Sequence, residues 1–384
     1  MARAAALWLA AWLPAAGAWD KDGHEAIGMT TMSALEGAAT AQVKRLMHGR
    51  DAVDVAAWAH KVNKKFPWTV ELHYQRQPAA RCGDKDISKK PADLSHCPDN
   101  RCLVKGLKHF YGRLVSKPLI EINWPEGMKL TDADRVKFLI NLMGDLHQPL
   151  HFGIEQDDLG RNVTVLFRGK KTSLYEMWDH EIAQTVMKDS PGFWWGGWTH
   201  VQRTRVEYEK DGAEWKKEGV KLFERWADET SRYVCENVYR NPLTGRSIHD
   251  DMKDGVFHVD DNLYEVWKRE MLVRMLVAGA RTAIVLNSIL QERGAESLQG
   301  GTAVSEIEGE EDEDRKAPVA GRRADAHHAA HGSGPRQGLT AAVLNLGIFV
   351  VVLIVFLQVM RLWLGKDAVN AADRAKRQEG GKKI

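Results

Sequence analysis

The chain has 384 residues, of which 44% are hydrophobic and 28% charged, so it carries enough apolar side chains for a large folded core. Its 54 basic and 52 acidic side chains nearly cancel, which excludes a histone-like basic protein and an acidic disordered one. A mean hydropathy of −0.40 excludes a polytopic membrane protein but permits a single span. Four cysteines are too few for a small disulfide scaffold, although they allow two bonds.

Residues 1–18 show the succession of features that is typical of a secretory signal peptide. Arg3 supplies a short positive region, an apolar stretch follows, and Ala16-Gly17-Ala18 provides the small residues of a cleavage site. A short buried helix is the alternative, but the small-residue ending favours the signal peptide. Cleavage after residue 18 would make Trp19 the N-terminal residue.

The other end of the chain predicts a membrane anchor. Residues 341–360 carry no charge, and about 20 such residues cross a bilayer as a helix, whereas a buried core helix would normally show a polar face. Residues 361–384 hold seven basic and three acidic side chains, which fits a cytoplasmic tail. We therefore expect a transmembrane helix at 339–362, a basic tail at 363–384, and a type I plasma-membrane protein whose folded part is extracellular or in the secretory lumen.

Between the anchor and the folded part, residues 291–338 contain an acidic run and are otherwise rich in Pro, Gly, Ala and His. Such a composition cannot bury a core, so we expect a flexible stalk. Residues 19–290 are expected to form the folded ectodomain, which we expect to be monomeric.

The ectodomain has mainly helical periodicity. Apolar residues recur at helical spacing over 131–146, 222–234 and 262–290. Thr131 and Asp134 have the spacing of a helix cap, and Pro149 should end that helix. Residues 163–167 alternate as one arm of a small hairpin ahead of Ser173. The sequence thus predicts an all-α domain with one small β-hairpin.

The residues suited to chemistry are histidines and aspartates scattered along this domain. Asp145, His147 and His151 lie in one short motif, GDLHQPLH, whereas His24 and Asp179 lie far from it in sequence. Imidazole and carboxylate are natural zinc ligands, although a lone histidine is more often structural. The spacing alone is a weak signal of a metal site, because no compact motif such as HExxH occurs.

The combination of an N-terminal Trp19, His24 five residues later, GDLHQPLH and the Trp-Asp pair at 178–179 resembles one family. These features are similar to the single-strand-specific zinc nucleases of the P1 and S1 type, in particular the membrane-anchored 3′-nucleotidase/nuclease branch. The resemblance covers residues 19 to about 290. It implies the all-α fold shared with the zinc phospholipases C, three zinc ions in a cleft, and single-stranded DNA, RNA and 3′-nucleotides as substrates.

The resemblance also implies particular metal ligands. One zinc would be held by the main-chain amine and carbonyl of Trp19 together with His24, and Asp145 would bridge it to a neighbour. An α-amino group has a pKa of roughly 7.7–8.0, so zinc can displace its proton near neutral pH. The implied ligand positions are Trp19, His24, His60, His73, Asn141, Asp145, His151, Tyr175 and Asp179.

Three of these positions depart from the family pattern. His60 stands where the family has an aspartate, and Asn141 and Tyr175 each stand where it has a histidine. An amide is a weak neutral ligand, and a phenol with a pKa of about 10 binds zinc poorly unless it is ionised. By this comparison the site at Trp19 and His24 is intact, whereas the two neighbouring sites each lack one good ligand.

The supporting positions differ as well. Asn63 stands at the family's catalytic arginine, Tyr74 keeps the base-stacking aromatic, and Arg76 replaces an acid. The family's Gly-Gly-Asn turn reads Gly-Arg-Asn and ends at Asn162. We expect Asp145 and Asn63 at the catalytic centre, Tyr74, Arg76 and Asn162 at the substrate, and a glycan at Asn162, because Asn-Val-Thr is a sequon.

The four cysteines permit three pairings by sequence alone. The resemblance implies bonds between Cys97 and Cys102 and between Cys82 and Cys235.

Three functions remain open at this stage. The first is a zinc-dependent endonuclease and 3′-nucleotidase at the cell surface. The second is a catalytically impaired paralogue with incomplete zinc sites that binds nucleic acid or acts as a surface protein. The third is a phospholipase C-like lipid hydrolase, against which Tyr74 argues.

Overall fold

A computed structural model describes residues 19–83, 90–125, 128–194, 201–293 and 298, which all belong to one compact unit. The predicted signal peptide, most of the predicted stalk, the membrane segment and the tail lie outside the described residues. The α-helices are α1 (Lys21–Ala34), α2 (Gly37–Leu46), α3 (Ala52–Val55), α4 (Trp58–Lys65), α5 (Ala79–Gly83), α6 (Leu103–Leu114), α7 (Asp132–Asp145), α8 (Leu174–Glu176), α9 (Ile182–Asp189), α10 (Val201–Glu218), α11 (Leu222–Tyr233) and α12 (Asp261–Arg293).

Short turns of other helix types connect these helices. The 3₁₀ turns are η1 (Pro67–His73), η3 (Pro98–Asn100), η4 (Pro149–Phe152), η5 (Glu155–Asp157) and η8 (Gly219–Lys221). Two π-helical turns are η6 (Met177–Glu181) and η9 (Val234–Val238). The strands are β1 (Thr164–Phe167), β2 (Lys170–Ser173) and β3 (Phe257–Val259). The mainly helical fold that the sequence predicts is confirmed.

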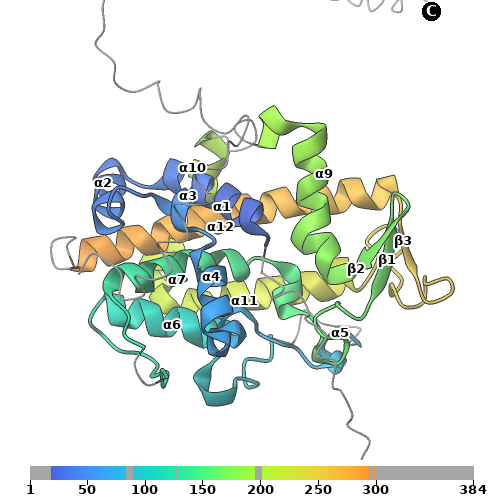
Figure 1. The fold of residues 1–384 in the computed structure, drawn as a ribbon, viewed down its shortest axis with the longest axis horizontal. Helices are drawn as coiled ribbons and strands as arrows, with labels where there is room; N and C mark the ends of the chain where they lie inside the picture. The colour runs from blue at the N-terminus through green and yellow to red at the C-terminus, as the bar shows by residue number, and fades with distance from the viewer. Residues whose placement is uncertain (1–18, 84–89, 126–127, 195–200, 294–297, 299–384) are drawn as a thin grey trace, which may run out of the picture. The chain divides into compact units, whose positions relative to one another are not determined.

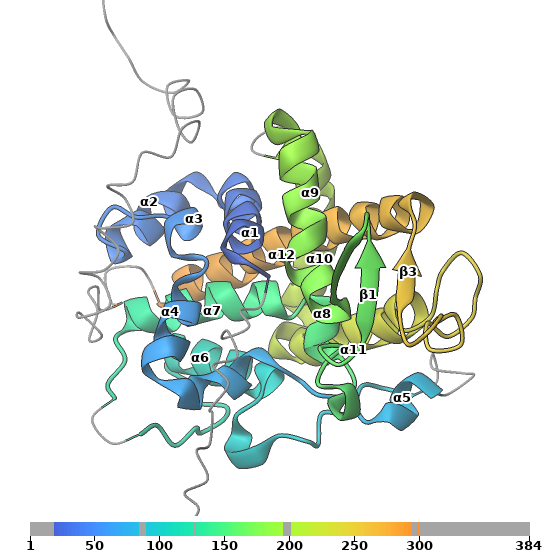
Figure 2. The ribbon, with the colours of Figure 1, turned by 45° about the vertical axis from the view of Figure 1, so that its right-hand side comes forward.

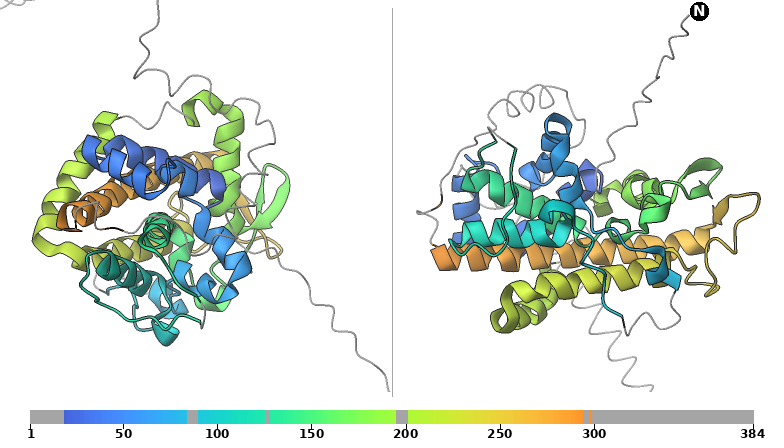
Figure 3. Two further views of the ribbon diagram at one scale, coloured as in Figure 1. Left: turned by 60° about the vertical axis from the view of Figure 1, so that its left-hand side comes forward. Right: turned by 90° about the horizontal axis from the view of Figure 1, so that it is seen from below.

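The long helix α12 is the centre of the domain. It packs against α1, α10 and α7 (Figure 1). The left view of Figure 3 shows α12 between the blue N-terminal helices and the teal helices of the middle of the chain. Among the described residues, α12 is the helix long and apolar enough to cross a bilayer, but 72% of its apolar window is buried inside the domain. It is therefore a core helix, in agreement with the periodicity over 262–290.

Helix α7 forms where the sequence predicts it. The side chain of Thr131 accepts a hydrogen bond from the backbone N–H of Asp134, and the Asp134 side chain caps Thr131 in return. This reciprocal cap satisfies two N–H groups that a helix start would leave unpaired. The helix ends at Asp145, and Pro149 starts the separate turn η4. Asp145 thus lies at the last position of a helix of which every residue but Arg135 is buried.

A glycine allows α1 to lie directly against α12. A Cβ atom on Gly279 would lie only 2.5 Å from the Cβ atom of Thr30 on α1. Real Cβ atoms do not approach so closely, so only glycine permits this spacing. The contact fixes α1, which carries His24, against the core.

The predicted hairpin is confirmed and has a third strand. β1 pairs antiparallel with β2, with Thr164 opposite Ser173, and β3 adds to β1 in parallel. Arg168 and Gly169 form the turn, and both have positive φ, as two-residue hairpin turns of this kind require. Figure 2 shows this small sheet at the end of the domain remote from α2.

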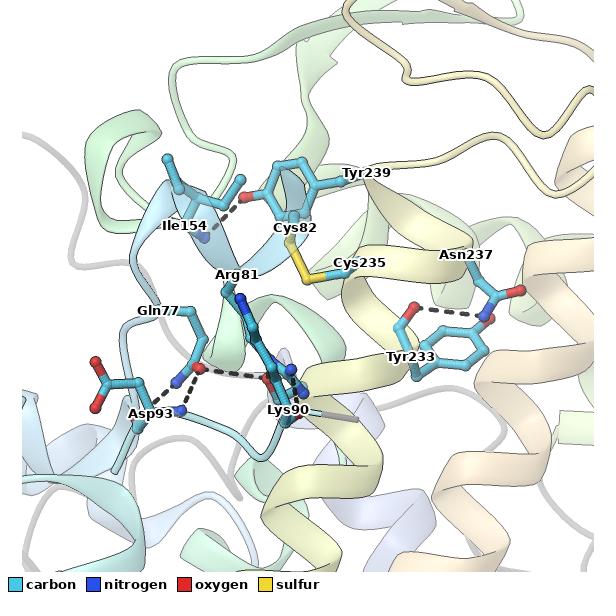
Figure 4. Close-up of a disulfide and its surroundings, with 12 residues drawn as sticks. Gln77, Arg81, Cys82, Lys90, Asp93, Ile154, Tyr233, Cys235, Asn237 and Tyr239 are labelled. Carbon is cyan, nitrogen blue, oxygen red and sulfur yellow. Dashed lines mark hydrogen bonds between the residues drawn. A yellow bond between two sulfur atoms is a disulfide. The ribbon is translucent and has the colours of Figure 1, made fainter. Parts of the chain in front are cut away.

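Both implied disulfides are present. Cys97 bonds Cys102 across a sequence separation of 5, and Cys82 bonds Cys235 across a separation of 153. Figure 4 shows the second bond between α5 and η9, where Tyr239 accepts a hydrogen bond from the backbone of Ile154 nearby. The long bond ties an early segment of the chain to a late one.

The two disulfides should differ in what their removal costs. The Cys82–Cys235 bond closes a much longer loop than the Cys97–Cys102 bond, so it removes more conformational entropy from the unfolded chain. Replacing Cys82 and Cys235 by alanine should therefore lower the free energy of unfolding by about 4–5 kcal/mol. The matched Cys97→Ala/Cys102→Ala variant should lose only about 2 kcal/mol. Denaturant unfolding without reductant measures both, and equal losses would contradict the expectation.

Candidate active site

Asp145 is the centre of a buried cluster of histidines. One carboxylate oxygen, Oδ2, lies 2.7 Å from Nδ1 of His73, and the other, Oδ1, lies 3.3 Å from Nε2 of His24. All three side chains are almost completely buried. Asp145 ends helix α7, His73 ends the turn η1 and His24 lies in helix α1. The fold therefore brings His24 to a carboxylate that is 121 positions later in the sequence.

Helix α1 holds His24 in place through local interactions at its start. The Asp20 side chain accepts a hydrogen bond from the backbone N–H of Gly23, which caps the helix. The indole of Trp19 donates to the carbonyl of Gly144, 3.1 Å away. The His24 ring lies against Gly144, where a Cβ atom would be 2.8 Å from the ring. Trp19 and His24 thus both contact Gly144, the residue that precedes Asp145.

His60 and Asn141 complete this part of the cluster. The ligand atoms of His24, His60 and Asp145 all lie within 4.8 Å of one another, the arrangement that a metal ion requires. The ring centroids of His24 and His60 are 4.9 Å apart. The Asn141 amide donates to the carbonyl of Ala56 at 2.8 Å, and its nitrogen lies 3.5 Å from Nε2 of His60.

Three buried polar atoms in this cluster make no hydrogen bond: Nε2 of His24, Oδ1 of Asp145 and Oδ1 of Asn141. A buried polar atom without a partner costs about 1–3 kcal/mol, so native proteins rarely leave several together. An imidazole nitrogen and a carboxylate oxygen that face each other at 3.3 Å are both zinc donors. The residues present therefore fit a divalent metal at this position.

The electrostatics of the cluster agree with its donor role. Burial opposes ionisation of Asp145, but His73 and the contact with His24 outweigh it and hold the pKa of Asp145 well below its usual range. Burial, followed by the charge of His24, lowers the pKa of His60 well below its usual value. The cluster therefore combines a carboxylate with a neutral imidazole, the protonation states that bind metal.

The residues around His151 are arranged differently from the histidine cluster around Asp145. Nε2 of His151 lies 3.2 Å from the hydroxyl of Tyr175, and the two rings are stacked. Nδ1 of His151 donates to the carbonyl of His73 at 2.6 Å. Both nitrogens of His151 therefore have partners within the protein. Burial lowers the pKa of His151 to about 3, so its ring is neutral at physiological pH.

Asp179 lies near this group, and its carboxyl group also has a partner within the protein. The π-helical turn η6 carries it, and its Oδ1 accepts a hydrogen bond from Gln148 at 3.3 Å. Burial, followed by Asp20, raises the pKa of Asp179 well above its usual value. Burial, followed by Asp179, likewise raises the pKa of Tyr175. The hydroxyl of Tyr175 contacts Nε2 of His151, and Oδ1 of Asp179 accepts from Gln148. Because a phenol is not among the usual zinc ligands, this group lacks one donor and does not fit a zinc ion.

Asn63 lies at the edge of the histidine cluster. Its Oδ1 accepts a hydrogen bond from Thr69 at 2.6 Å and lies 3.2 Å from Nε2 of His73. Because a carboxylate only accepts, Nδ1 of His73 donates to Asp145, and Asn63 contacts the other nitrogen of the ring. Asn63 therefore positions a member of the cluster.

Tyr74 is covered by charged side chains. Only 4% of it is exposed, and the guanidinium carbons of Arg76 and Arg161 lie 5.6 and 5.3 Å from its ring centroid. Arg161 also donates to the Tyr74 hydroxyl at 3.0 Å. Asn162, by contrast, is exposed, as a glycan acceptor must be.

The sequence predicts no role for Arg161 or Gln148, which contact Tyr74 and Asp179 respectively. For Arg161 a signal was present, because it interrupts the expected Gly-Gly-Asn turn. No pattern in the sequence indicates a role for Gln148, because its contact with Asp179 depends on how η4 and η6 pack together.

The comparison with known proteins identifies the family. The model of the S1/P1 Nuclease family matches residues 19–291, which is most of the chain. The chain belongs to the S1/P1 nuclease family. Similar proteins include Endonuclease 4 of Arabidopsis thaliana, 26% identical over 61% of this chain and 80% of the relative. Endonuclease 2 of the same plant is 24% identical over 74% of this chain and 94% of the relative.

Nuclease S1 of Aspergillus oryzae is 23% identical over 59% of this chain and 78% of its own length. Membership of the S1/P1 nuclease family indicates a hydrolase that acts on nucleic acid. Within the part of the chain that the structure describes, the histidine cluster groups three possible metal donors, from His24, His60 and Asp145.

Gly144 should be essential to the geometry of the cluster. A methyl group there would displace the His24 ring from Asp145, so Gly144→Ala should lower nucleic-acid hydrolysis at least about tenfold, by misplacement of a catalytic group. Gly37→Ala is the matched control, because nothing lies within 4 Å of its added methyl group. Initial rates and circular dichroism of both variants test this, and full activity of Gly144→Ala would contradict it.

Proposed function

We propose that this protein is a zinc-dependent endonuclease and 3′-nucleotidase that cleaves single-stranded DNA and RNA and removes 3′-phosphates. The observation that carries the proposal is the pair of buried, unbonded donor atoms, Nε2 of His24 and Oδ1 of Asp145, 3.3 Å apart in a member of a nuclease family. A metal between such atoms would remove the cost of leaving both unpaired.

The residues that would hold zinc are those of the histidine cluster. His24, Asp145 and the main chain of Trp19 would form one site, and His60, His73 and Asp145, with Asn141, the neighbouring one. When bound, zinc supplies Lewis acidity for activating water and polarising a phosphate.

The chain's own residues then orient and shield the reaction. Asp145 holds His73 by a 2.7 Å contact with Nδ1, and Asn63 contacts Nε2 of the same ring. His73 and Asp145 are almost completely buried, which keeps bulk water from them and strengthens their electrostatic interaction.

One observation favours a second candidate, an impaired paralogue that binds nucleic acid with little turnover. Nε2 of His151, the nitrogen that would face a metal, lies 3.2 Å from the hydroxyl of Tyr175, a residue that stands where the resemblance expects a histidine. The third zinc expected from the resemblance therefore lacks one of its donors, and activity would rest on the first two positions.

We further propose that the protein acts at the cell surface. Two disulfides within the described residues suit an oxidising compartment. The predicted signal peptide at 1–18 and membrane helix at 339–362 would place the folded domain outside the cytosol, anchored by its C-terminal span.

A substrate panel with metal control tests the proposed activity. The purified full-length protein should hydrolyse single-stranded DNA, RNA and 3′-AMP faster than double-stranded DNA. Chelation should abolish hydrolysis and added zinc should restore it. His24→Ala should lose at least about tenfold, the usual effect of losing an important ligand or its support.

His109→Asn provides the matched control, because His109 is a buried imidazole that contacts the carbonyl of Ile120 and the indole of Trp124 instead. It should retain activity and zinc dependence. Hydrolysis that survives chelation would contradict the zinc proposal. Zinc binding without hydrolysis of any substrate would favour the impaired paralogue.

A further inference from the structure

Arg161 occupies an unusual position beside the histidine cluster. It lies in the loop between η5 and β1, and its guanidinium carbon is 3.7 Å from the ring centroid of Tyr175. The same group donates from Nη2 to the hydroxyl of Tyr74 at 3.0 Å and from Nη1 to the carbonyl of Asp158. Its side chain is 21% exposed. A permanent positive charge is thus fixed between two aromatic rings and still reaches the surface.

The fixed charge lies where a metal ion does not fit. Tyr175, whose ring Arg161 covers, places its hydroxyl 3.2 Å from Nε2 of His151. Tyr74, on the other side, has its ring centroid 4.7 Å from that of His151. His151 in turn has its Nδ1 3.7 Å from Oδ1 of Asp145. Arg161 therefore contacts Tyr74 and Tyr175, these rings contact His151, and His151 contacts the Asp145 carboxylate.

A second arginine lies at the same edge. Arg76 lies 5.6 Å from the Tyr74 ring centroid, and its charge is shared with Glu71 and Asp158. Arg161 also pairs with Asp158, at 3.6 Å. A guanidinium has five N–H donors, and two of those of Arg161 make the hydrogen bonds described above. Its planar fork matches the geometry of a phosphate group.

We propose that Arg161 binds a phosphate of the substrate. In this chain the arginine supplies the positive charge that a zinc ion would supply if the His151, Tyr175 and Asp179 group had a full set of donors. Tyr74 and Tyr175 hold the guanidinium by cation–π contact, and Arg76 shares the Asp158 carboxylate with it. The protein therefore uses at most two zinc ions and one arginine. This inference rests on the proposed function.

Two readouts that need no turnover test the inference in the full-length protein. The first is zinc per chain, measured by mass spectrometry of the metal. The wild type should bind no more than two ions, and Arg161→Met should bind the same number. Arg161→Gly combined with Tyr175→His should gain about one ion, because it restores a donor and removes the competing charge.

The second readout is the equilibrium binding of inorganic phosphate. Arg161→Met should weaken it about tenfold or more, as expected for a lost hydrogen bond to a charged group, and Arg161→Lys should recover part of the loss. Arg168→Met is the matched control. Arg168 is also stacked on two aromatic rings, those of Phe167 and Tyr264, but pairs with Asp189 and Asp261. It should bind phosphate as the wild type does.

Three ions per wild-type chain, or unchanged phosphate binding by Arg161→Met, would overturn the inference. An equal loss of phosphate affinity in Arg168→Met would also overturn the inference, because the weaker binding in Arg161→Met would then reflect a structural change and not a lost phosphate contact. Failure of the proposed function would appear differently, as a wild-type protein that binds zinc and phosphate but cleaves no substrate.

Discussion

The candidate site depends on the interactions of the Asp145 carboxylate. It is completely buried, and its two oxygens face His73 on one side and His24 on the other. A buried charge is tolerated only when it is paired or binds a metal. The pair with His73 satisfies one oxygen through a short contact. The other oxygen faces His24 without a hydrogen bond, and that incomplete pairing is the structural sign of a metal position.

The fold keeps these groups together although they are distant in sequence. α7 ends at Asp145, α1 brings His24 against Gly144, and η1 delivers His73. Because α12 packs against both α1 and α7, a change in its packing would move the ligands as well as the core. In the His151 group the Tyr175 ring stacks on His151 and is covered by Arg161, and we propose that this arginine takes the place of a metal ion. One scaffold therefore supports two chemically different halves of the site.

Much of this could be predicted from the sequence, because local patterns determine it. The Thr131 cap, the hairpin before Ser173 and the periodicity of α12 each depend on neighbouring residues. The cluster of His24, His73 and Asp145 followed from a family resemblance and not from spacing. The roles of Arg161 and Gln148 could not be derived, since they depend on which rings and carboxylates the tertiary fold places beside them. The predicted membrane span and signal peptide lie outside the described residues and stay predictions.

The most direct test of this account is the zinc content of Asp145→Asn compared with that of the wild type. The substitution keeps the size of the side chain but removes the charge and one donor oxygen. If the carboxylate is shared by two metal positions, the variant should lose nearly all bound zinc while remaining folded by circular dichroism. A folded variant with the wild-type zinc content would contradict the central claim.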